Sequence, residues 1–302
     1  MSSLIGIDWG TTTFRAYLYD QSSTYVDRIS SAAGIMQELH PDFENILYDQ
    51  IGSWLTRYPT IPIIASGMIT SRQGWVETPY LACPASLEDL GKTLTAFRLH
   101  DGRDIHFVAG VSQQHPTANI MRGEETQMAG LASRKPTLAV LPGTHSKWIW
   151  MADECISRFT TFITGELFTA LTEHTILGRL ITDRKDPTSF RLGVEEGYYS
   201  TSRTGGILSQ LFGARAKPIL GLMQPNAVYD YISGLLLGTE VKEAVELGVE
   251  AQIRPLVCGS SALVTRYQKA LQICGFKVSV AEQDSASTGL YRIAVEAGLL
   301  AR

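Results

Sequence analysis

The segment from Asp8 to Arg15, DWGTTTFR, combines residue types that can hold phosphate. Gly10 permits a tight turn whose backbone N–H groups approach a ligand closely, and the hydroxyls of Thr11 and Thr12 add donors. Asp8 ends an apolar run and would face a bound Mg²⁺, usually through water. Arg15 could reach a phosphoryl group in transfer. A Gly-Thr turn beside an Asp is also common turn chemistry, so this segment alone does not decide the function.

A second segment, VLPGTHSKWIW at residues 140–150, repeats this plan. Gly143 and Thr144 follow an apolar strand pattern and precede an alternating aromatic one. Lys147 could hold the β- or γ-phosphate as a point charge, although the alternation equally allows it to point into solvent. His145 is more typical of a hydrogen-bonded loop residue than of a base. Two matched Gly-Thr turns indicate a weak internal duplication.

The hydrophobic periodicity predicts the elements that must position these turns. Strand patterns cover residues 4–9, 14–20, 61–66, 104–111, 137–141 and 146–151, and residues 254–282 indicate a strand, a Gly/Ser turn, a helix and another strand. Helical spacing covers residues 42–58, 122–133, 165–181 and 226–248, and a last helix places Leu290 and Ile293 on one face. The chain is therefore predicted to be α/β. The repeated turn predicts an N-terminal domain of residues 1–115 and a C-terminal domain of residues 116–302.

The composition is that of a soluble globular protein: 302 residues, 44% hydrophobic and 19% charged. A net charge of −4 offers no basic footprint for nucleic acid or an anionic membrane, so a small solute is the expected partner. The N-terminus has no Lys or Arg before its short apolar run, which predicts a cytoplasmic protein without a secretory signal. The cysteines show no paired spacing that would indicate a metal or redox motif; they are Cys83, Cys155, Cys258 and Cys274.

Three segments together resemble the motifs of the actin, hexokinase and sugar-kinase superfamily. IGIDWGTTTFRA resembles its first phosphate motif, VLPGTHSKWIW its second, and LVCGSSALVTRY its adenosine motif. The resemblance implies a two-domain actin-like ATPase (ribonuclease H-like) sugar-kinase fold, with ATP, Mg²⁺ and substrate in an interdomain cleft. In that fold, Gly259 and Ser260 would form the turn against the adenosine and α-phosphate. The last helix, about 286–302 with Thr288 and Gly289 at its start, would return toward the N-terminal domain.

The wider set of motifs resembles the 2-dehydro-3-deoxygalactonokinase family: GMITSRQGWVETPYLACPA, MRGEETQMAGL, LPGTHSKW, TFITGELFTAL and SGLLLG. The resemblance covers nearly the whole chain. It implies ATP-dependent phosphorylation of 2-keto-3-deoxy-D-galactonate at its 6-hydroxyl in galactonate catabolism. One departure is that Leu141 and Pro142 stand where the superfamily often carries an Asp, so metal binding would depend mainly on Asp8. Another is that the chain is much shorter than glycerol kinase.

Phosphoryl transfer also needs a base that accepts the proton of the attacking hydroxyl. In glycerol kinase relatives this base is an Asp that follows a Gly at the start of a helix. Gly123 and Glu124 match that context here, so Glu124 is the expected base. Its neighbour Glu125 is the alternative, since only one of two adjacent helix residues can face the same site. Either carboxylate could instead only complement the helix dipole.

The loop SRQGWVETPY offers partners for a sugar acid. Arg72 could grip the carboxylate through two parallel hydrogen bonds, Trp75 could form an apolar wall, and Glu77 could bind hydroxyls. Arg122 is a second candidate for the carboxylate. The alternatives are that Trp75 only packs in the core and that Arg72 is only a surface charge.

Other functions remain open from the residues alone. One is a kinase for a related sugar acid or polyol, including 2-keto-3-deoxygluconate, because one or two side chains decide stereochemistry. Others are a nucleotide-driven switch of the actin kind and a sensor without turnover. The substrate-like loop from Arg72 to Tyr80, and the presence of Asp8 and both glutamates, favour a small-molecule kinase.

Overall fold

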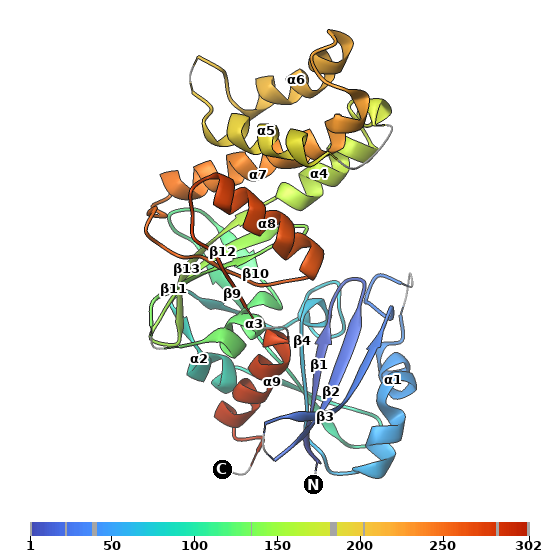
Figure 1. The fold of residues 1–302 in the computed structure, drawn as a ribbon. Coiled ribbons are helices and arrows are strands. Elements are labelled where there is room, and N and C mark those ends of the chain that lie inside the picture. The colour runs from blue at the N-terminus through green and yellow to red at the C-terminus, as the bar shows by residue number, and fades with distance from the viewer. Residues whose placement is uncertain are drawn as a thin grey trace. The chain divides into compact units, whose positions relative to one another are not determined.

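The computed structural model describes residues 2–21, 23–37, 41–133, 135–181, 186–201, 203–281 and 284–300. The chain forms two compact units (Figure 1). The first consists of Met1–Pro136, Trp150–Phe159 and Glu282–Arg302, and the second of Thr137–Ile149 and Thr160–Ala281. The domain boundary predicted near residue 115 stays a prediction, because compactness alone does not show which parts fold or move independently.

The first unit is built on a six-stranded mixed sheet with the strand order β3-β2-β1-β4-β8-β7. β1, β2 and β3 are antiparallel neighbours, whereas β1, β4 and β8 run parallel and β7 is antiparallel to β8. The bounds are β1 Ser2–Trp9, β2 Phe14–Asp20, β3 Tyr25–Ser31, β4 Ile63–Ser66, β7 Thr95–Arg98 and β8 Asp104–Phe107. The predicted hairpin at the N-terminus and the buried strand that follows it are confirmed.

Helices cover both faces of this sheet. On one face, Ile5, Ile7 and Trp9 of β1 pack against helix α1 (Phe43–Arg57), whose first turn is capped by Asp42. On the other face, the Tyr19 hydroxyl donates to the Ser287 carbonyl of helix α9 (Ser285–Glu296) at 2.8 Å. Figure 1 shows α1 and α9 on opposite sides of β1 and β2. Because strand side chains alternate, Asp8 lies on the α9 face.

The predicted single strand at residues 104–111 is two strands in two sheets, so that prediction is wrong. The chain leaves β8 after Phe107 and joins a small sheet of order β10-β9-β5. The switch occurs at Gly110, where an added Cβ would lie 2.7 Å from the Tyr80 ring. The small sheet consists of β5 Tyr80–Ala82, β9 Gly110–Gln113 and β10 Asn119–Met121. Strand β6 (Ala85–Ser86), helix α2 (Leu87–Lys92) and helix α3 (Glu124–Leu131) complete the unit.

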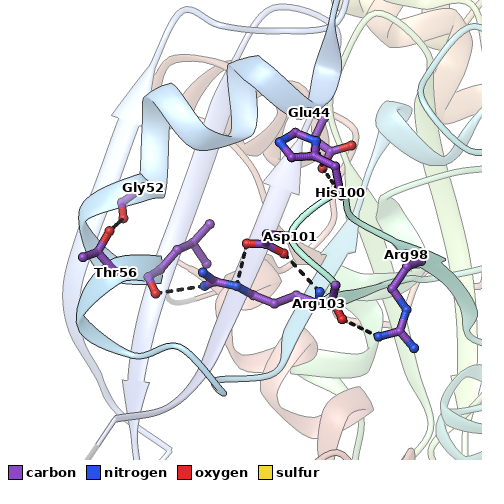
Figure 2. Close-up of polar contacts among 9 residues, drawn as sticks. Glu44, Gly52, Thr56, Arg98, His100, Asp101 and Arg103 are labelled. Atoms are coloured by element: carbon purple, nitrogen blue, oxygen red, sulfur yellow. Dashed lines mark hydrogen bonds and ion pairs between the residues drawn. The ribbon is translucent and has the colours of Figure 1, made fainter.

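Polar contacts fix the β7–β8 turn to α1 (Figure 2). Glu44 accepts from the backbone N–H of His100 at 2.7 Å. Arg103 pairs with Asp101 at 2.8 Å and donates to the carbonyl of Leu55 at 2.9 Å. Arg103 is therefore a guanidinium that ties a loop to a helix in the same unit as the candidate active site.

The second unit is built around part of another six-stranded sheet, of order β15-β14-β11-β12-β13-β6. Its bounds are β11 Thr137–Leu141, β12 Ser146–Ala152, β13 Cys155–Phe162, β14 Leu256–Val257 and β15 Ser279–Val280. β11, β14 and β15 run parallel. β11 and β12 are neighbours on either side of the second Gly-Thr turn, as β1 and β2 are around the first. The repeat seen in the sequence therefore exists in the strand order.

The helices of the second unit are α4 Thr164–Glu173, α5 Pro187–Tyr198, α6 Ile207–Ile219, α7 Val228–Glu246 and α8 Ser261–Ile273. The sequence patterns predict no element for α5 and α6. The reason is that α5 contacts α7 through glycines such as Gly193 and Gly234, while α6 exposes Leu208 (86%) and Phe212 (65%). The buried stripe of α5 consists of Phe190, Gly193, Val194 and Gly197, so glycine stands at positions where a helix usually shows larger apolar residues. Among the described residues, no helix is long and apolar enough to cross a membrane.

Candidate active site

Asp8 ends β1 directly before the first Gly-Thr turn. In the β1–β2 hairpin it stands opposite Arg15, whose Nη2 lies 3.3 Å from the Asp8 carboxylate. Burial raises the pKa of Asp8, the guanidinium of Arg15 lowers it, and the carboxylate of Glu124 raises it further. Asp8 and Glu124 therefore lie within electrostatic reach of each other, although they come from a strand and a helix far apart in the sequence.

The first Gly-Thr turn is closed and braced from one side. The N–H of Gly10 donates to the carbonyl of Thr13 at 2.9 Å, which leaves Thr12 exposed at the tip and Thr11 half-buried. Gly34 lies against this turn, and a Cβ there would be 2.3 Å from the carbonyl carbon of Thr12. Only glycine fits, since larger residues would displace the turn. The sequence reasoning missed Gly34, because nothing local marks its contact with a loop more than twenty residues earlier.

Two glycines bring the ends of β4 and α3 together beside Asp8. Gly67 has φ +96° and Gly123 has φ +103°, which are left-handed conformations that favour glycine. A Cβ on Gly123 would lie 3.2 Å from the Cα of Gly67, and a Cβ on Gly67 would lie 2.7 Å from the carbonyl oxygen of Trp9. The backbone at the start of α3 thus approaches the end of β1 closely enough to place Glu124 near Asp8.

The two adjacent glutamates at the start of α3 have different surroundings. Glu125 is 1% exposed, and its two oxygens accept from the N–H of Gly123, both at 2.8 Å. Burial, reinforced by the charge of Glu124, raises the pKa of Glu125 to about 7. Glu124 is partly exposed and accepts from the backbone N–H of Arg122 at 3.0 Å. Of the two glutamates, Glu124 is therefore the one that reaches solvent and interacts electrostatically with Asp8.

Three buried polar atoms on the Asp8 side of the sheet have no hydrogen-bond partner among the described residues: Arg15 Nε, Tyr17 Oη and Ser66 Oγ. Ser66 is 1% exposed and stands opposite Asp8 in the parallel β1–β4 pair. Burial, followed by the Asp8 carboxylate, raises the pKa of Tyr17 to about 12. Buried polar groups are normally satisfied, so these atoms mark a place where a ligand could supply partners. The sequence reasoning missed Ser66 and Tyr17, although Ser66 ends a predicted strand as Asp8 does.

The predicted sugar-acid loop is exposed at its polar residues and anchored at its aromatic one. Arg72 and Glu77 are exposed. Trp75 packs into the core of the first unit, with ring centroids 5.2–6.4 Å from those of Trp9, Phe43, Phe97 and Phe107. Trp75 therefore packs in the core and fixes the middle of the loop, and its predicted role as an apolar wall for the substrate stays a prediction. Arg122 is buried beneath the loop, where its guanidinium contacts protein groups.

The second Gly-Thr turn contacts the start of α4. A Cβ on Gly165 would lie 2.3 Å from the carbonyl oxygen of Gly143, and the N–H of Glu166 donates to the carbonyl of Thr144 at 2.9 Å. Lys147 is 4% exposed, so it does not point into solvent, and its Nζ donates to the carbonyl of His145 at 3.1 Å. The His145 ring lies 2.5 Å from a Glu166 oxygen and is half exposed.

A buried carboxylate that the sequence reasoning missed supports this second turn. Glu240 of α7 is 2% exposed and accepts from Ser146 Oγ at 2.8 Å, from Trp148 Nε1 at 2.8 Å and from Tyr267 Oη at 2.9 Å. Burial raises the pKa of Glu240, while these donors lower it. The signal in the sequence is a lone Glu in the apolar run SGLLLGTEV. Glu240 joins α7 and α8 to the strand that follows the phosphate turn.

The predicted adenosine motif lies next to the second Gly-Thr turn. Cys258 N–H donates to the carbonyl of Val140 at 2.9 Å, and a Cβ on Gly259 would lie 3.6 Å from Pro142. Ser260 is exposed at the residue before α8. A mainly apolar cavity of about 150 Å³ opens beside these turns within the second unit. Its lining includes Gly143, Thr164, Phe168, Tyr229, Leu263 and Tyr267.

Comparison with solved structures identifies the class of fold. The chain superposes on xylulose kinase from Lactobacillus acidophilus with a TM-score of 0.52 at 10% identity, covering 99% of this chain and 90% of that one. This likeness shows the fold alone. Together with the two Gly-Thr turns, it defines an α/β actin-like sugar-kinase fold, as the sequence motifs predicted.

The particular family follows from closer relatives. The model of the 2-keto-3-deoxy-galactonokinase family matches residues 8–293. A 2-dehydro-3-deoxygalactonokinase from Escherichia coli (strain K12) is 35% identical over 285 residues, which cover 93% of this chain and 94% of that protein. A crystal structure of a protein of the same kind from Sinorhizobium meliloti has a TM-score of 0.88 at 30% identity, covering 96% and 98% of the two chains. The chain belongs to the 2-keto-3-deoxy-galactonokinase family. Membership in a kinase family implies the use of ATP.

Proposed function

We propose that this protein transfers the γ-phosphoryl group of ATP to the 6-hydroxyl of 2-dehydro-3-deoxy-D-galactonate. The family supports the substrate, since the Escherichia coli relative carries that activity in its name. The observation that carries the chemistry is the close approach of the start of α3 to Asp8: a Cβ on Gly123 would lie 3.2 Å from the Cα of Gly67, and a Cβ on Gly67 would lie 3.3 Å from Asp8 Oδ1. Two carboxylates in different surroundings can take two roles, one toward a cation and one toward a proton.

Glu124 would be the base. It is partly exposed, whereas Glu125 is turned inward and occupied by the N–H of Gly123. A base in phosphoryl transfer accepts the proton of the attacking hydroxyl and orients that hydroxyl toward the phosphorus. Arg15, whose guanidinium already neutralises Asp8, would stabilise the charge of the group in transfer.

Asp8 fits Mg²⁺ in the way that this ion is usually bound with nucleotides. No group of three or more His, Cys, Asp or Glu side chains in the described part of the chain could hold a metal by itself. Mg²⁺ keeps several waters and needs only one or two carboxylates when phosphates supply the rest. Asp8 offers such a carboxylate, and opposite it lies Ser66 Oγ, which has no hydrogen-bond partner among the described residues. The ion would neutralise phosphate charge.

The second unit would bind much of the nucleotide. Gly143 and Thr144 would contact phosphates through backbone N–H groups, and Lys147 would add charge from its buried position. The adenine would enter the apolar cavity, with Gly259 and Ser260 against the ribose and α-phosphate. In the first unit, Gly10, Thr11 and Thr12 would bind phosphate oxygens through the backbone N–H groups and hydroxyls of their turn.

The exposed loop over α3 would select the sugar acid. Arg72 would bind the carboxylate and Glu77 the hydroxyls, because both side chains are exposed on a loop whose centre is held by Trp75. A loop that is fixed by core packing can present polar groups in a defined geometry, which stereochemical selection requires.

The deciding experiment is a coupled ADP-release assay with Mg-ATP. The panel holds 2-dehydro-3-deoxy-D-galactonate, its gluconate epimer, glycerol and several aldoses. We expect turnover of the galactonate compound well above the others. Equal turnover of the gluconate epimer would contradict the proposed preference for the galactonate compound. ATP binding without turnover of any compound would overturn the kinase proposal.

The assignment of the base has a matched pair of variants. Glu124→Gln should lower kcat by a factor on the order of 10² or more and leave ATP binding nearly unchanged. Glu125→Gln should keep most of kcat, because that side chain faces inward. The reverse ranking would transfer the role to Glu125.

The nucleotide pocket can be tested by filling it. Leu263 lines the cavity and is 39% exposed, so a tryptophan can be introduced without a forced core change. Leu263→Trp should raise the Kd for ATP about tenfold. The KM for the sugar acid at saturating ATP should stay within about twofold of the wild-type value. Unchanged ATP affinity would place the adenine elsewhere.

A further inference from the structure

Arg122 makes contacts that differ from those of a substrate ligand. Its side chain is buried, and all three guanidinium nitrogens have protein partners. Nη1 donates to the carbonyl oxygen of Thr70 at 2.6 Å, to its hydroxyl at 2.7 Å and to the hydroxyl of Thr78. Nη2 donates to the carbonyl of Thr78 at 3.0 Å, and Nε lies 3.3 Å from the Tyr80 hydroxyl. The guanidinium carbon also lies 4.2 Å from the centroid of the Tyr80 ring.

These contacts leave too few donors for a carboxylate. A guanidinium has five N–H groups, and the two of Nη1, one of Nη2 and that of Nε have acceptors here. A two-bond grip on a carboxylate needs two parallel N–H groups. At most one remains on Arg122, whereas Arg72 on the loop above is exposed. The carboxylate is better served by Arg72.

The partners of Arg122 lie at the two ends of the candidate substrate loop. Thr70 precedes Arg72, while Thr78 and Tyr80 follow Glu77. The ends also bond to each other, since the N–H of Thr78 donates to the carbonyl of Thr70 at 3.0 Å. Arg122 thus joins the two ends of the loop, and the exposed Arg72 and Glu77 lie between these ends.

The same residue is bonded to the expected base. The backbone N–H of Arg122 donates to Glu124 at 3.0 Å, at the start of α3. The side chain fixes the loop and the main chain fixes the carboxylate, so one residue sets the distance between them. The guanidinium fork is planar and makes several bonds in one geometry, which a lysine cannot reproduce.

We propose that Arg122 is a positioning residue that holds the substrate loop, residues 70–80, in register with Glu124. This proposal rests on the proposed function for its catalytic consequence, but the clamp itself is a property of the protein without substrate. Loss of the clamp lets the loop move relative to Glu124. Sugar-acid binding and turnover then fall together, while nucleotide binding does not change.

The test compares Arg122→Met with Arg103→Met. Both changes remove a guanidinium that ties a loop to the first unit, but Arg103 holds the β7–β8 turn against α1 (Figure 2). In the protein without ligands, trypsin cleavage of the exposed Arg72–Gln73 bond is followed by mass spectrometry. We expect Arg122→Met to speed this cleavage at least tenfold and Arg103→Met to leave it within twofold. Equal rates in wild type and Arg122→Met, with the variant folded, would overturn the clamp.

The kinetic arm separates positioning from ligand binding. Arg122→Met should raise the KM for the sugar acid and lower kcat, each about tenfold, with the KM for ATP within twofold. The measurement is repeated with the amide of the sugar acid. A positioning role predicts the same loss for the acid and the amide, whereas a direct contact to the carboxylate predicts that the loss disappears with the amide.

A second variant covers the case in which Arg122→Met does not fold. Thr78→Val keeps the side-chain volume and removes one acceptor of the clamp, together with the bonds that this hydroxyl donates to the carbonyls of Thr70 and Val108. It should give the same pattern with smaller effects, about threefold in cleavage and in KM for the sugar acid. If the wild-type protein turned over no sugar acid, the proposed function would fail, and the cleavage rates would still decide whether Arg122 clamps the loop.

Discussion

Gly130 of α3 and Gly289 of α9 face each other with no room for a methyl group. A Cβ on Gly289 would lie 1.8 Å from the carbonyl oxygen of Thr126, and a Cβ on Gly130 would lie 1.9 Å from that of Ser285. The helix that carries Glu124 therefore lies backbone to backbone on the last helix of the chain. The position of the expected base depends on residues more than 150 positions later.

Gly289→Ala should lower the free energy of unfolding by about 1–3 kcal/mol, because the helices must separate to admit the methyl group. Gly52→Ala is the control, because Gly52 lies in α1 with nothing within 4 Å of an added Cβ. Alanine should raise the free energy of unfolding there by about 0.5–1 kcal/mol, since it favours the helix more than glycine does. Urea unfolding measures both. Similar stabilities for the two variants would contradict the close helix contact.

Glu125→Gln should change how stability depends on pH. The pKa of Glu125 is about 7 in the folded protein against a usual 4.5, so the folded state keeps a proton that the unfolded state loses between these values. This stabilisation is fully present below about pH 4.5 and is lost as pH rises through 7. The free energy of unfolding of the wild type should therefore fall by about 3 kcal/mol between pH 4.5 and 8, relative to that of Glu125→Gln.

The measurement for Glu125 is urea unfolding of both proteins over that pH range. The comparison cancels the other titrating groups, since the two proteins differ at one residue. Parallel stability curves would show that Glu125 ionises in the folded protein as it does in the unfolded chain.

Ser66→Ala should separate stability from activity. Its hydroxyl is buried without a partner among the described residues, so its removal should leave the free energy of unfolding unchanged or raise it by up to about 1 kcal/mol. Ser287→Ala is the control: it deletes a buried hydroxyl that lies 2.9 Å from Tyr19 Oη, and it should cost about 1 kcal/mol.

The activity of Ser66→Ala is the second readout. If Ser66 contacts the phosphates or the water around their cation, kcat/KM should fall about tenfold or more while Ser287→Ala keeps near wild-type values. A fully active Ser66→Ala enzyme would leave the hydroxyl without a role in the reaction.

Glu240→Leu should be far more harmful than Glu240→Gln. The leucine leaves buried donors without an acceptor, namely those of Ser146, Trp148 and Tyr267. The free energy of unfolding should therefore fall by about 3 kcal/mol or more. The glutamine keeps one acceptor oxygen and should cost about 1 kcal/mol. Thermal unfolding and ATP titration measure the effect, and Glu240→Gln should still weaken ATP binding. Equal stability of both variants would contradict the network.

Much of the fold could be predicted from local patterns. The N-terminal hairpin, α1, β4, α3, α7 and the strand-helix-strand segment near the C-terminus are all predicted from the sequence, and the structure confirms them. The last helix, expected at about residues 286–302, begins at Ser285 as predicted and ends earlier, at Glu296. Helices α5 and α6 are not predicted from the sequence: the buried stripe of α5 contains Gly193 and Gly197, and α6 exposes Leu208 and Phe212.

The site was only partly predictable for a related reason. Asp8, Gly10 and Gly143 lie in turns whose local sequence shows their chemistry. Ser66 ends a predicted strand and Glu240 is a lone carboxylate in an apolar run, but neither local pattern shows that Ser66 lies opposite Asp8 or that Glu240 bonds to Ser146 and Tyr267. For Arg122 the residue type suggested a ligand, whereas the structure gives its guanidinium protein partners that the sequence could not show.

The path of the chain has a consequence for how the protein is made. The first unit is closed by α9, in which Ser287 accepts from Tyr19, 268 residues earlier in the chain. At about 5–20 residues per second, the ribosome needs roughly ten to thirty seconds after α3 to reach α9. The whole second unit emerges in that interval. The N-terminal sheet is therefore synthesised well before the helix that covers one of its faces.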